Sequence, residues 1–522
     1  MVKIFICFSA LLFLVSCAST DDGQYVENKP FVLIEATISD IHTAFINNEI
    51  TCQKLVMRYI DRIKHYDQSS KLNSIILINP NAQNSAKQLD QQFVNSQTLK
   101  PLHCIPVILK DNFDTGDMPT EAGSIALKGS IPPDDAFMVR KLREAGAIVI
   151  AKSNMGEWAF SPYDTISSTH GETRNAYDLT RVPAGSSGGT ASAVAANFGV
   201  IGMGSDTGNS IRGPASHLAL VGIRSTIGAT SRDGIVPLVL NRDIGGPLMR
   251  TVKDTAKVYG IIAGYDTADP ITNAVKGNAQ TDYSKNLSVD GLKGVRLAVL
   301  TQIYADETTD FEIENLMEKA IKDLSSAGAV IVNDFQIPGF DELRKATGFC
   351  SRFRFDIKNY FDSLGRHAPV HSLEEVISKN LYRKENQGAM DWAMGVSIKP
   401  AEQEPPCVYV DGDPRRKQFL MAVLKAMNTE KIDAIIYPTW SNPPRKLGDS
   451  ESPHGNNSPI IAPHTGQPAI TVPMGYVNGN LPAGLQMLGR PFSEAKLLQY
   501  AYTYEQQTKH RKPPSQFGRI NP

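Results

Sequence analysis

A stretch rich in small residues lies in the middle of the chain, between Pro183 and Pro214. It opens with Gly185-Ser-Ser-Gly-Gly189, and residues 190–197, which follow directly, are almost all small residues and good helix formers. This order predicts a helix that begins at the serine and glycine segment. The first turn of a helix leaves backbone N–H groups unpaired, so this segment can present them to an anion or to a polar side chain.

A second segment of the same kind, Gly204-Ser-Asp-Thr-Gly-Asn-Ser210, follows the apolar run 198–203. The run is short enough for a buried strand, and the small residues after it predict a turn that aims successive N–H groups at one point. A serine hydroxyl becomes a good nucleophile only when a neighbouring base takes its proton, and no histidine lies beside these serines. The pattern therefore indicates acyl-transfer chemistry with a base other than histidine.

Residues 102–111 read Leu-His-Cys-Ile-Pro-Val-Ile-Leu-Lys-Asp. Together with the two serine and glycine segments, they resemble the amidase signature family. Further segments that resemble the family are residues 118–127, 134–159, 231–238 and 470–506. The resemblance covers residues 32–513, and within the family the chain looks most like the bacterial peptide-amidase type.

The resemblance implies a catalytic triad of Ser210 as the nucleophile, Ser186 as a bridging serine after a cis peptide bond, and Lys110 as the base. Ser186 rather than Ser187 is the bridge because in the family this residue precedes the nucleophile by 24 positions, the separation between Ser186 and Ser210. A lysine acts as a base only when it is neutral, and burial favours the neutral form. The apolar run 105–109 predicts a buried strand that would supply this burial.

The resemblance also implies an oxyanion hole made by the backbone N–H groups of Thr207, Gly208, Asn209 and Ser210. Two residues depart from the commonest family pattern. Cys104 stands where the family usually has glycine before Ile-Pro, and Asn209 stands where it often has glycine before the nucleophile. Neither change removes a catalytic group. Asparagine tolerates a positive φ better than most residues, so the turn is compatible with Asn209, whose side chain would narrow the acyl pocket.

Other catalytic motifs fit the chain poorly. The first segment matches G-x-S-x-G with Ser187 as the nucleophile, but that motif needs a buried strand before it, and residues 175–184 are polar and contain Pro183. Ser493-Glu-Ala-Lys496 matches S-x-x-K, but the S-D-N and K-T-G motifs of penicillin-binding proteins are absent from the sequence. The sequence also lacks the glycine patterns of dinucleotide-binding and P-loop proteins.

The first residues of the chain predict an export signal. Lys3 is followed by the apolar run 4–15, which is too short to span a bilayer but has the length of a signal-peptide core. The run leads into Leu14-Val-Ser-Cys17, which resembles a bacterial lipoprotein box, where cleavage precedes a cysteine that becomes the lipidated first residue. An ordinary secretory signal cleaved near Ala18 or Ser19 is the alternative.

These features divide the chain into a lipoprotein signal peptide (1–16), a polar tether (17–31) and a single amidase domain (32–522). They predict a location in the bacterial cell envelope, lipid-anchored through Cys17 at the outer membrane or on the periplasmic face. The net charge of −1 and the lack of long charged runs give no reason to expect nucleic acid or an anionic membrane surface as a partner. Membrane contact is therefore expected through the lipid alone.

Four cysteines remain after the predicted lipidation site: Cys52, Cys104, Cys350 and Cys407. Their spacing fits no zinc pattern, and the sequence leaves open both one disulfide in an oxidising compartment and four free thiols. His367 and His371 are four residues apart but lack a nearby acidic motif. No metal and no cofactor are therefore expected.

Helix and strand patterns alternate along the chain. Residues 134–144 predict an amphipathic helix followed by a strand at 147–151, and a similar unit recurs at 312–332. Such alternation predicts an α/β fold with a largely parallel sheet covered by helices on both faces. The resemblance implies the amidase-signature fold, so the expected sheet is a large mixed, mostly parallel one flanked by helices on both faces. In the family, the region equivalent to residues 336–415 tends to shape the substrate channel.

The sequence thus predicts an exported, lipid-anchored amidase that hydrolyses a carboxamide C–N bond of a small-molecule or peptide substrate through an acyl-enzyme on Ser210. Two alternatives remain. One is the amidase subunit of a glutamyl-tRNA amidotransferase, which an export signal disfavours because its partners are cytosolic. The other is a catalytically silent binding lipoprotein, which would have no need to keep Lys110, Ser186 and Ser210 together.

Overall fold

The computed structural model describes residues 1, 31–277, 282–348, 351–395 and 412–520. The predicted signal peptide and tether, including Cys17, lie outside the described residues except for Met1 and Phe31. Cys350 and Cys407 lie outside them as well. No helix within the described ranges combines the length and the apolar character needed to cross a membrane.

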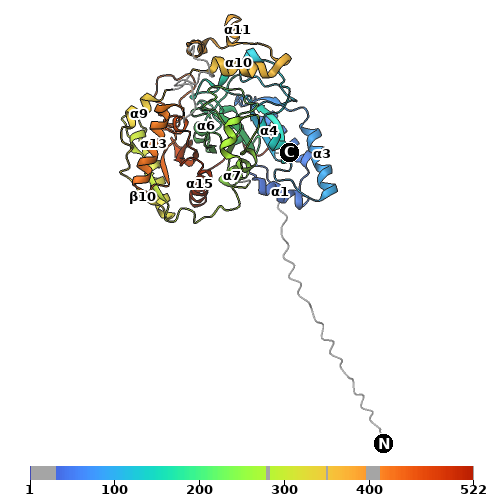
Figure 1. Cartoon of the computed structure of the whole chain (residues 1–522). Helices are drawn as coiled ribbons and strands as arrows, with labels where there is room; N and C mark the ends of the chain where they lie inside the picture. Colours follow the sequence, from blue (N-terminus) through green and yellow to red (C-terminus); the bar gives the residue numbers. More distant parts are fainter. Residues whose placement is uncertain (2–30, 278–281, 349–350, 396–411, 521–522) are drawn as a thin grey trace.

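A mixed sheet runs through the molecule (Figure 1). Its eleven strands lie in the order β1-β3-β2-β6-β8-β7-β12-β13-β11-β9-β10. The strands are β1 (Ile75–Ile78), β2 (Pro106–Lys110), β3 (Ile148–Ser153), β6 (Ile201–Asp206), β7 (Val221–Arg224), β8 (Ile244–Met249), β9 (Arg296–Val299), β10 (Val330–Val332), β11 (Ala434–Pro438), β12 (Ala469–Val477) and β13 (Leu481–Leu488). A separate hairpin pairs β4 (Ile166–Ser167) with β5 (Gly171–Glu172).

Helices surround this sheet (Figure 1). They are α1 (Ile38–Ile46), α2 (Cys52–Tyr66), α3 (Ala82–Ser96), α4 (Phe137–Glu144), α5 (Gly188–Ala195), α6 (Arg212–His217), α7 (Val252–Ile262), α8 (Phe311–Ser326), α9 (Phe340–Ala346), α10 (Phe353–Leu364), α11 (Leu373–Ser378), α12 (Gln387–Met394), α13 (Pro414–Thr429), α14 (Ala462–Thr465) and α15 (Glu494–Thr508). Helices α10, α11 and α12, which we call the cap, pack together through contacts of α10 with the other two, and α10 and α11 lie together at the top of Figure 1.

The α/β fold and the mixed sheet are confirmed, but the expected predominance of parallel pairs is wrong. Among the described strands of this sheet, β2 pairs in parallel with β3 and β6, and β9 with β10 and β11, whereas the other six pairings are antiparallel. The helix and strand alternation of residues 134–151 and 312–332 describes only the parallel parts. Between them, strands such as β12 and β13 need only a short turn, because antiparallel neighbours require no helical crossover.

Local predictions agree with the structure except at one strand. The helix and strand expected at 134–151 are α4 and β3, and the apolar run 105–109 leads into β2, whose five residues are all buried. The strand expected at 198–203 begins later, at Ile201, and continues to Asp206. It is extended because β6 pairs with β8 up to the Asp206–Ile244 pair, so the expected turn is shortened to residues 207–210.

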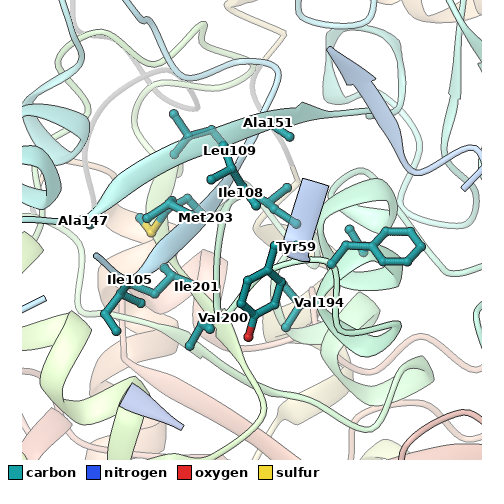
Figure 2. Close-up of a cluster of buried hydrophobic side chains, with 14 of the residues drawn as sticks. Tyr59, Ile105, Ile108, Leu109, Ala147, Ala151, Val194, Val200, Ile201 and Met203 are labelled. Atoms are coloured by element: carbon teal, nitrogen blue, oxygen red, sulfur yellow. The ribbon is translucent and has the colours of Figure 1, made fainter. Parts of the chain in front are cut away.

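Apolar packing holds β2 in place. Figure 2 shows Ile108 and Leu109 of this strand among buried side chains that include Ala151 of β3 and Met203 of β6. These residues have no exposed surface. Since interiors are close-packed, a strand with core on both faces has little freedom to shift. Lys110, the last residue of this strand, is therefore held in a fixed position by the packing of β2.

A disulfide joins Cys52, the first residue of α2, to Cys104, which precedes β2. From the sequence alone, this pairing was one of several possibilities. Cys104 has φ +62°, in the left-handed region that favours glycine, which explains why glycine is common in the family at this position. The bond fixes the chain segment that leads into β2 to a helix 52 residues earlier in the sequence.

We expect the double variant Cys52→Ser/Cys104→Ser to lower the free energy of unfolding by about 2–4 kcal/mol, because the bond closes a loop of 52 residues in the unfolded chain. Urea denaturation of the wild type and the variant measures this difference. Added reductant should destabilise the wild type and leave the variant unchanged. Equal midpoints for the two oxidised proteins would contradict the expectation.

Candidate active site

Lys110 ends β2 with its side chain fully buried. Its Nζ donates hydrogen bonds to Ser186 Oγ at 2.7 Å and to Ser205 Oγ at 2.8 Å. Burial lowers the pKa of Lys110 to about 7, although the negative charges of Asp206 and Asp243 partly offset this effect. A substantial fraction of this amine is therefore neutral near pH 7, when it can accept a proton.

Ser186 precedes helix α5, as the small-residue pattern predicts. The Gly185–Ser186 peptide bond is cis. The neighbouring glycines are needed for space, because a Cβ would lie 2.0 Å from Asp164 O on Gly185 and 2.1 Å from Asn154 O on Gly189. Close packing of backbone on backbone thus fixes the position of the Ser186 hydroxyl beside Lys110.

Ser210 lies in the turn between β6 and α6, at the wall of a cavity of about 450 Å³. The backbone N–H groups of residues 207–210 make no hydrogen bond to another described residue. The cavity is lined by Ala159, Phe160, Pro162, Tyr163, Thr207, Gly208, Asn209, Ser210, Leu238, Val239, Ala389, Trp392, Asn456 and Pro459. The turn can therefore offer both a hydroxyl and unpaired N–H donors to a molecule in this cavity.

Asn209 connects the two halves of the site. Its Nδ2 donates to Gly185 O at 2.8 Å and to Pro162 O at 3.0 Å, so the turn of Ser210 is tied to the peptide that precedes Ser186. The tolerance of asparagine for a positive φ is not needed here, because Asn209 is not among the residues with a positive φ. The asparagine is used for its side-chain amide rather than for its backbone tolerance.

A buried cluster of charged side chains, Asp206, Arg212 and Arg224, lies next to the same turn and supports it. Asp206 accepts from Arg212 Nε at 3.1 Å and from Arg224 Nη1 at 3.0 Å, and all three side chains are fully buried. Burial raises the pKa of Asp206, but the attraction of the two guanidinium groups outweighs it and holds that pKa below its usual range. Arg212 also donates to Gly208 O at 2.8 Å, which fixes the turn directly.

Sequence reasoning singled out Lys110, Ser186 and Ser210 but missed the polar residues around them. Asn112 Nδ2 donates to Ser205 Oγ at 2.9 Å, which orients the second partner of Lys110. Asp243 accepts from the Thr207 hydroxyl at 2.5 Å and so braces the turn. Ser205 lies inside β6, in the serine and glycine segment that follows the apolar run 198–203, whereas Asp243 lies in no recognisable motif.

The residues of the rejected motifs lie elsewhere. Ser187 is fully buried, donates to Ser205 O at 3.3 Å and does not line the cavity. Ser493 is the residue before α15, where its hydroxyl donates to Arg490 O. Across the described ranges, no group of three or more His, Cys, Asp or Glu side chains is placed to hold a metal, and this includes His367 and His371.

Comparison with known proteins places this site in a family. Residues 54–498 match the amidase family. The chain belongs to the amidase signature family. A probable amidase from Arabidopsis thaliana is 33% identical over 519 residues, which are 97% of this chain and 95% of that protein. The chain is therefore a hydrolase that acts on amide C–N bonds.

Solved structures of amidases share the fold. A peptide amidase from Stenotrophomonas maltophilia superposes with a TM-score of 0.82 at 34% identity, covering 93% of this chain and 99% of that one. One subunit of the glutamyl-tRNA(Gln) amidotransferase of Thermotoga maritima superposes with a TM-score of 0.70 at 28% identity, covering 91% of this chain and 95% of that one. The amidase fold thus accounts for nearly the whole described chain.

We expect Arg212→Met to lower the free energy of unfolding by about 3–5 kcal/mol, because it leaves the buried Asp206 with one guanidinium partner instead of two. Lys358→Met is the matched control, since it removes an exposed ion pair with Asp362 and should cost less than about 1 kcal/mol. Urea denaturation measures both. Similar losses in the two variants would show that the buried cluster has no special role.

Proposed function

We propose that this amidase is exported and lipid-anchored, and that it hydrolyses an uncharged carboxamide through an acyl-enzyme on Ser210, with Ser186 and Lys110 completing the triad. The observation that carries the proposal is the 2.7 Å contact between the buried Lys110 Nζ and Ser186 Oγ, beside the turn that presents Ser210 to the cavity. A lysine in this environment can be neutral and so can serve as the general base.

In the proposed reaction, Ser210 Oγ attacks the carbonyl carbon of the amide. Its proton passes to Ser186, and the proton of Ser186 passes to the neutral amine of Lys110. The carbonyl oxygen becomes an oxyanion, which the N–H groups of Thr207, Gly208, Asn209 and Ser210 stabilise. When the C–N bond breaks, a proton returns from Lys110 through Ser186 to the departing nitrogen. Water then attacks the ester by the same route and releases a carboxylic acid.

The lining of the cavity supports an uncharged substrate. None of the lining side chains in the described part of the chain is charged, and apolar groups such as Phe160, Leu238 and Trp392 form much of the wall. Free glutamine, an amino acid with a side-chain amide, would bring a carboxylate and an ammonium group into this cavity without a partner, which costs free energy. A peptide C-terminal amide carries no such charges near its scissile bond. The 34% identity to a peptide amidase supports this substrate class.

The second candidate, the amidase component of an amidotransferase, has support from sequence similarity. One subunit of the glutamyl-tRNA(Gln) amidotransferase of Alkaliphilus metalliredigens is 34% identical over 493 residues, which are 91% of this chain and 96% of that protein. The uncharged cavity lining and the predicted export signal favour the first candidate. Comparing ammonia release from a neutral peptide amide with release from free glutamine distinguishes the two.

Export and lipid anchoring rest on two independent features. The sequence of residues 1–17 has the pattern of a lipoprotein signal. The disulfide between Cys52 and Cys104 supports an oxidising destination, because disulfides persist outside the reducing cytosol. An amidase at the cell envelope is therefore consistent with both.

We expect kcat/KM for a neutral peptide amide to rise about tenfold per pH unit below pH 7 and to level above it. Burial holds the pKa of Lys110 at about 7, and the amine accepts a proton only after it has lost its own. Lys110→Ala should lower the rate by about 10²–10⁴-fold. Lys110→Arg should not restore it, because a guanidinium stays protonated. An active Lys110→Ala enzyme with the same pH profile would refute the assignment of the base.

Two serine variants accompany this measurement. Ser210→Ala should abolish both hydrolysis and covalent labelling by a fluorophosphonate, whereas Ser186→Ala should keep Lys110 in place and break only the proton relay. Mass spectrometry of the labelled peptide identifies the modified serine. Labelling of Ser187 would instead favour the G-x-S-x-G interpretation.

We expect Cys17→Ser to release the protein from the membrane fraction and to leave its amidase activity unchanged, because the predicted tether is remote in sequence from the triad. Cell fractionation and the mass of the mature N-terminus measure this. A wild-type protein that is soluble and begins at Ala18 or later would contradict the lipid anchor.

A further inference from the structure

Glu157 is a buried carboxylate that the proposed mechanism does not use. It begins the 3-10 helix η2 (Glu157–Ala159), and only 2% of its surface is exposed. Its Oε1 accepts a hydrogen bond from the hydroxyl of Ser168. Its Oε2 accepts from the backbone N–H of Arg383 at 2.9 Å and from Asn386 Nδ2 at 2.6 Å. All three donors are uncharged groups, and two of them, from Arg383 and Asn386, lie in the segment that joins α11 to α12 of the cap.

The two donors from Arg383 and Asn386 lie at the start of helix α12. Arg383 precedes the 3-10 helix η6 (Lys384–Asn386), which Asn386 ends, and η6 leads without a break into α12. Two faces of α12 differ. Met390 and Ala393 are fully buried in an apolar cluster with Trp158 and other residues, whereas Ala389 and Trp392 line the cavity. Residues three apart lie on one face of a helix, so the direction of α12 decides where Trp392 stands.

A second part of the cavity wall lies close to Glu157 in the sequence. Ala159 and Phe160 line the cavity, and Phe160 packs edge-on against Phe353 of α10 at 5.0 Å between ring centres. Glu157 therefore links the segment that carries residues 159–160 to the segment that leads into α12. This one carboxylate is therefore a direct hydrogen-bonded connection between the two segments.

We propose that Glu157 is a positioning residue that fixes α12, and that Trp392 is the residue by which this amidase selects substrates with a bulky apolar group. The proposal rests on the proposed function of the cavity. Trp392 is 38% exposed, so its indole has surface left to cover a substrate side chain. Aromatic contacts of this kind add to the free energy of apolar burial. A small amide gains nothing from the indole and is therefore indifferent to its position.

Two amides that differ in one side chain test this. N-acetylphenylalaninamide carries a benzyl group that can reach Trp392, and N-acetylglycinamide lacks it. For Trp392→Ala and Glu157→Ala we expect KM of the phenylalanine amide to rise about tenfold, with less than about a twofold change in kcat and in KM of the glycine amide. The rate of Ser210 labelling by a small fluorophosphonate should stay unchanged, because the probe does not need the indole.

Matched variants separate positioning from general damage. Glu157→Gln should restore most of the affinity, because its amide oxygen can still accept from Arg383 and Asn386, although its NH₂ group needs the Ser168 hydroxyl to turn and accept. Glu385→Ala, which removes an exposed carboxylate from the same segment, should have no effect. The double variant Glu157→Ala/Trp392→Ala should raise KM no further than Trp392→Ala alone, since both changes remove the same contact.

The proposal is overturned if the wild type shows no preference for the phenylalanine amide, if both amides lose affinity equally, or if the double variant shows additive losses. Trp392→Ala provides the test even where Glu157→Ala folds poorly, which thermal unfolding detects. A failure of the proposed function looks different, because the fluorophosphonate would then not label Ser210 in the wild type.

Discussion

The burial of Lys110 beside Ser186 is the constraint around which the site is built. Because this lysine is shielded from solvent, neighbouring groups must accept its hydrogen bonds, and they must do so in a way that allows both the charged and the neutral form of the amine. Ser205 and Ser186 supply the hydrogen bonds, while Asp206 and Asp243 attract the charge without contacting it closely enough to fix it. The packed strand β2 then holds the amine at the point where the segment before α5 places the serine hydroxyl.

A second constraint is the buried charge of Asp206. Its two arginine partners arise from different elements, Arg212 from α6 and Arg224 from β7. Because an unpaired charge in the interior is costly, the cluster stabilises the site only when these elements are all in place. The same arginine that neutralises Asp206 holds the carbonyl of Gly208. Stability of the fold and geometry of the turn are therefore properties of one set of hydrogen bonds.

How much of this could be predicted differs from residue to residue. The apolar run before Lys110 and the small residues after Ser186 have periodicity and composition that predict their elements, and the family resemblance implied that the three triad candidates belong together. The antiparallel centre of the sheet was missed because its pairing depends on contacts between distant segments, such as β8 with β6. Asp243 and Glu157 were missed for the same reason, since a single carboxylate outside a motif gains its meaning only from the groups that fold against it. The sequence left open which cysteines form a disulfide, and only the folded backbone shows that Cys52 and Cys104 lie close enough to do so.

The partners of Arg212 also have a consequence for how the enzyme is made. Besides Asp206 and Gly208, this arginine donates to Ser458 O at 2.8 Å and to Gln486 Oε1 at 3.0 Å, residues 246 and 274 positions further along the chain. The turn that carries Ser210 is thus completed by β13, which is synthesised long after it, although the turn itself lies in the first half of the polypeptide. A nascent chain that extends to Asp243 already contains Lys110, Ser186 and Ser210 together with the partners of these residues, but Arg212 still lacks two of its acceptors. The arginine that holds the turn of Ser210 therefore gains its full set of hydrogen bonds only after the C-terminal part of the chain has been made, and a chain interrupted before β13 leaves Arg212 without its Gln486 acceptor.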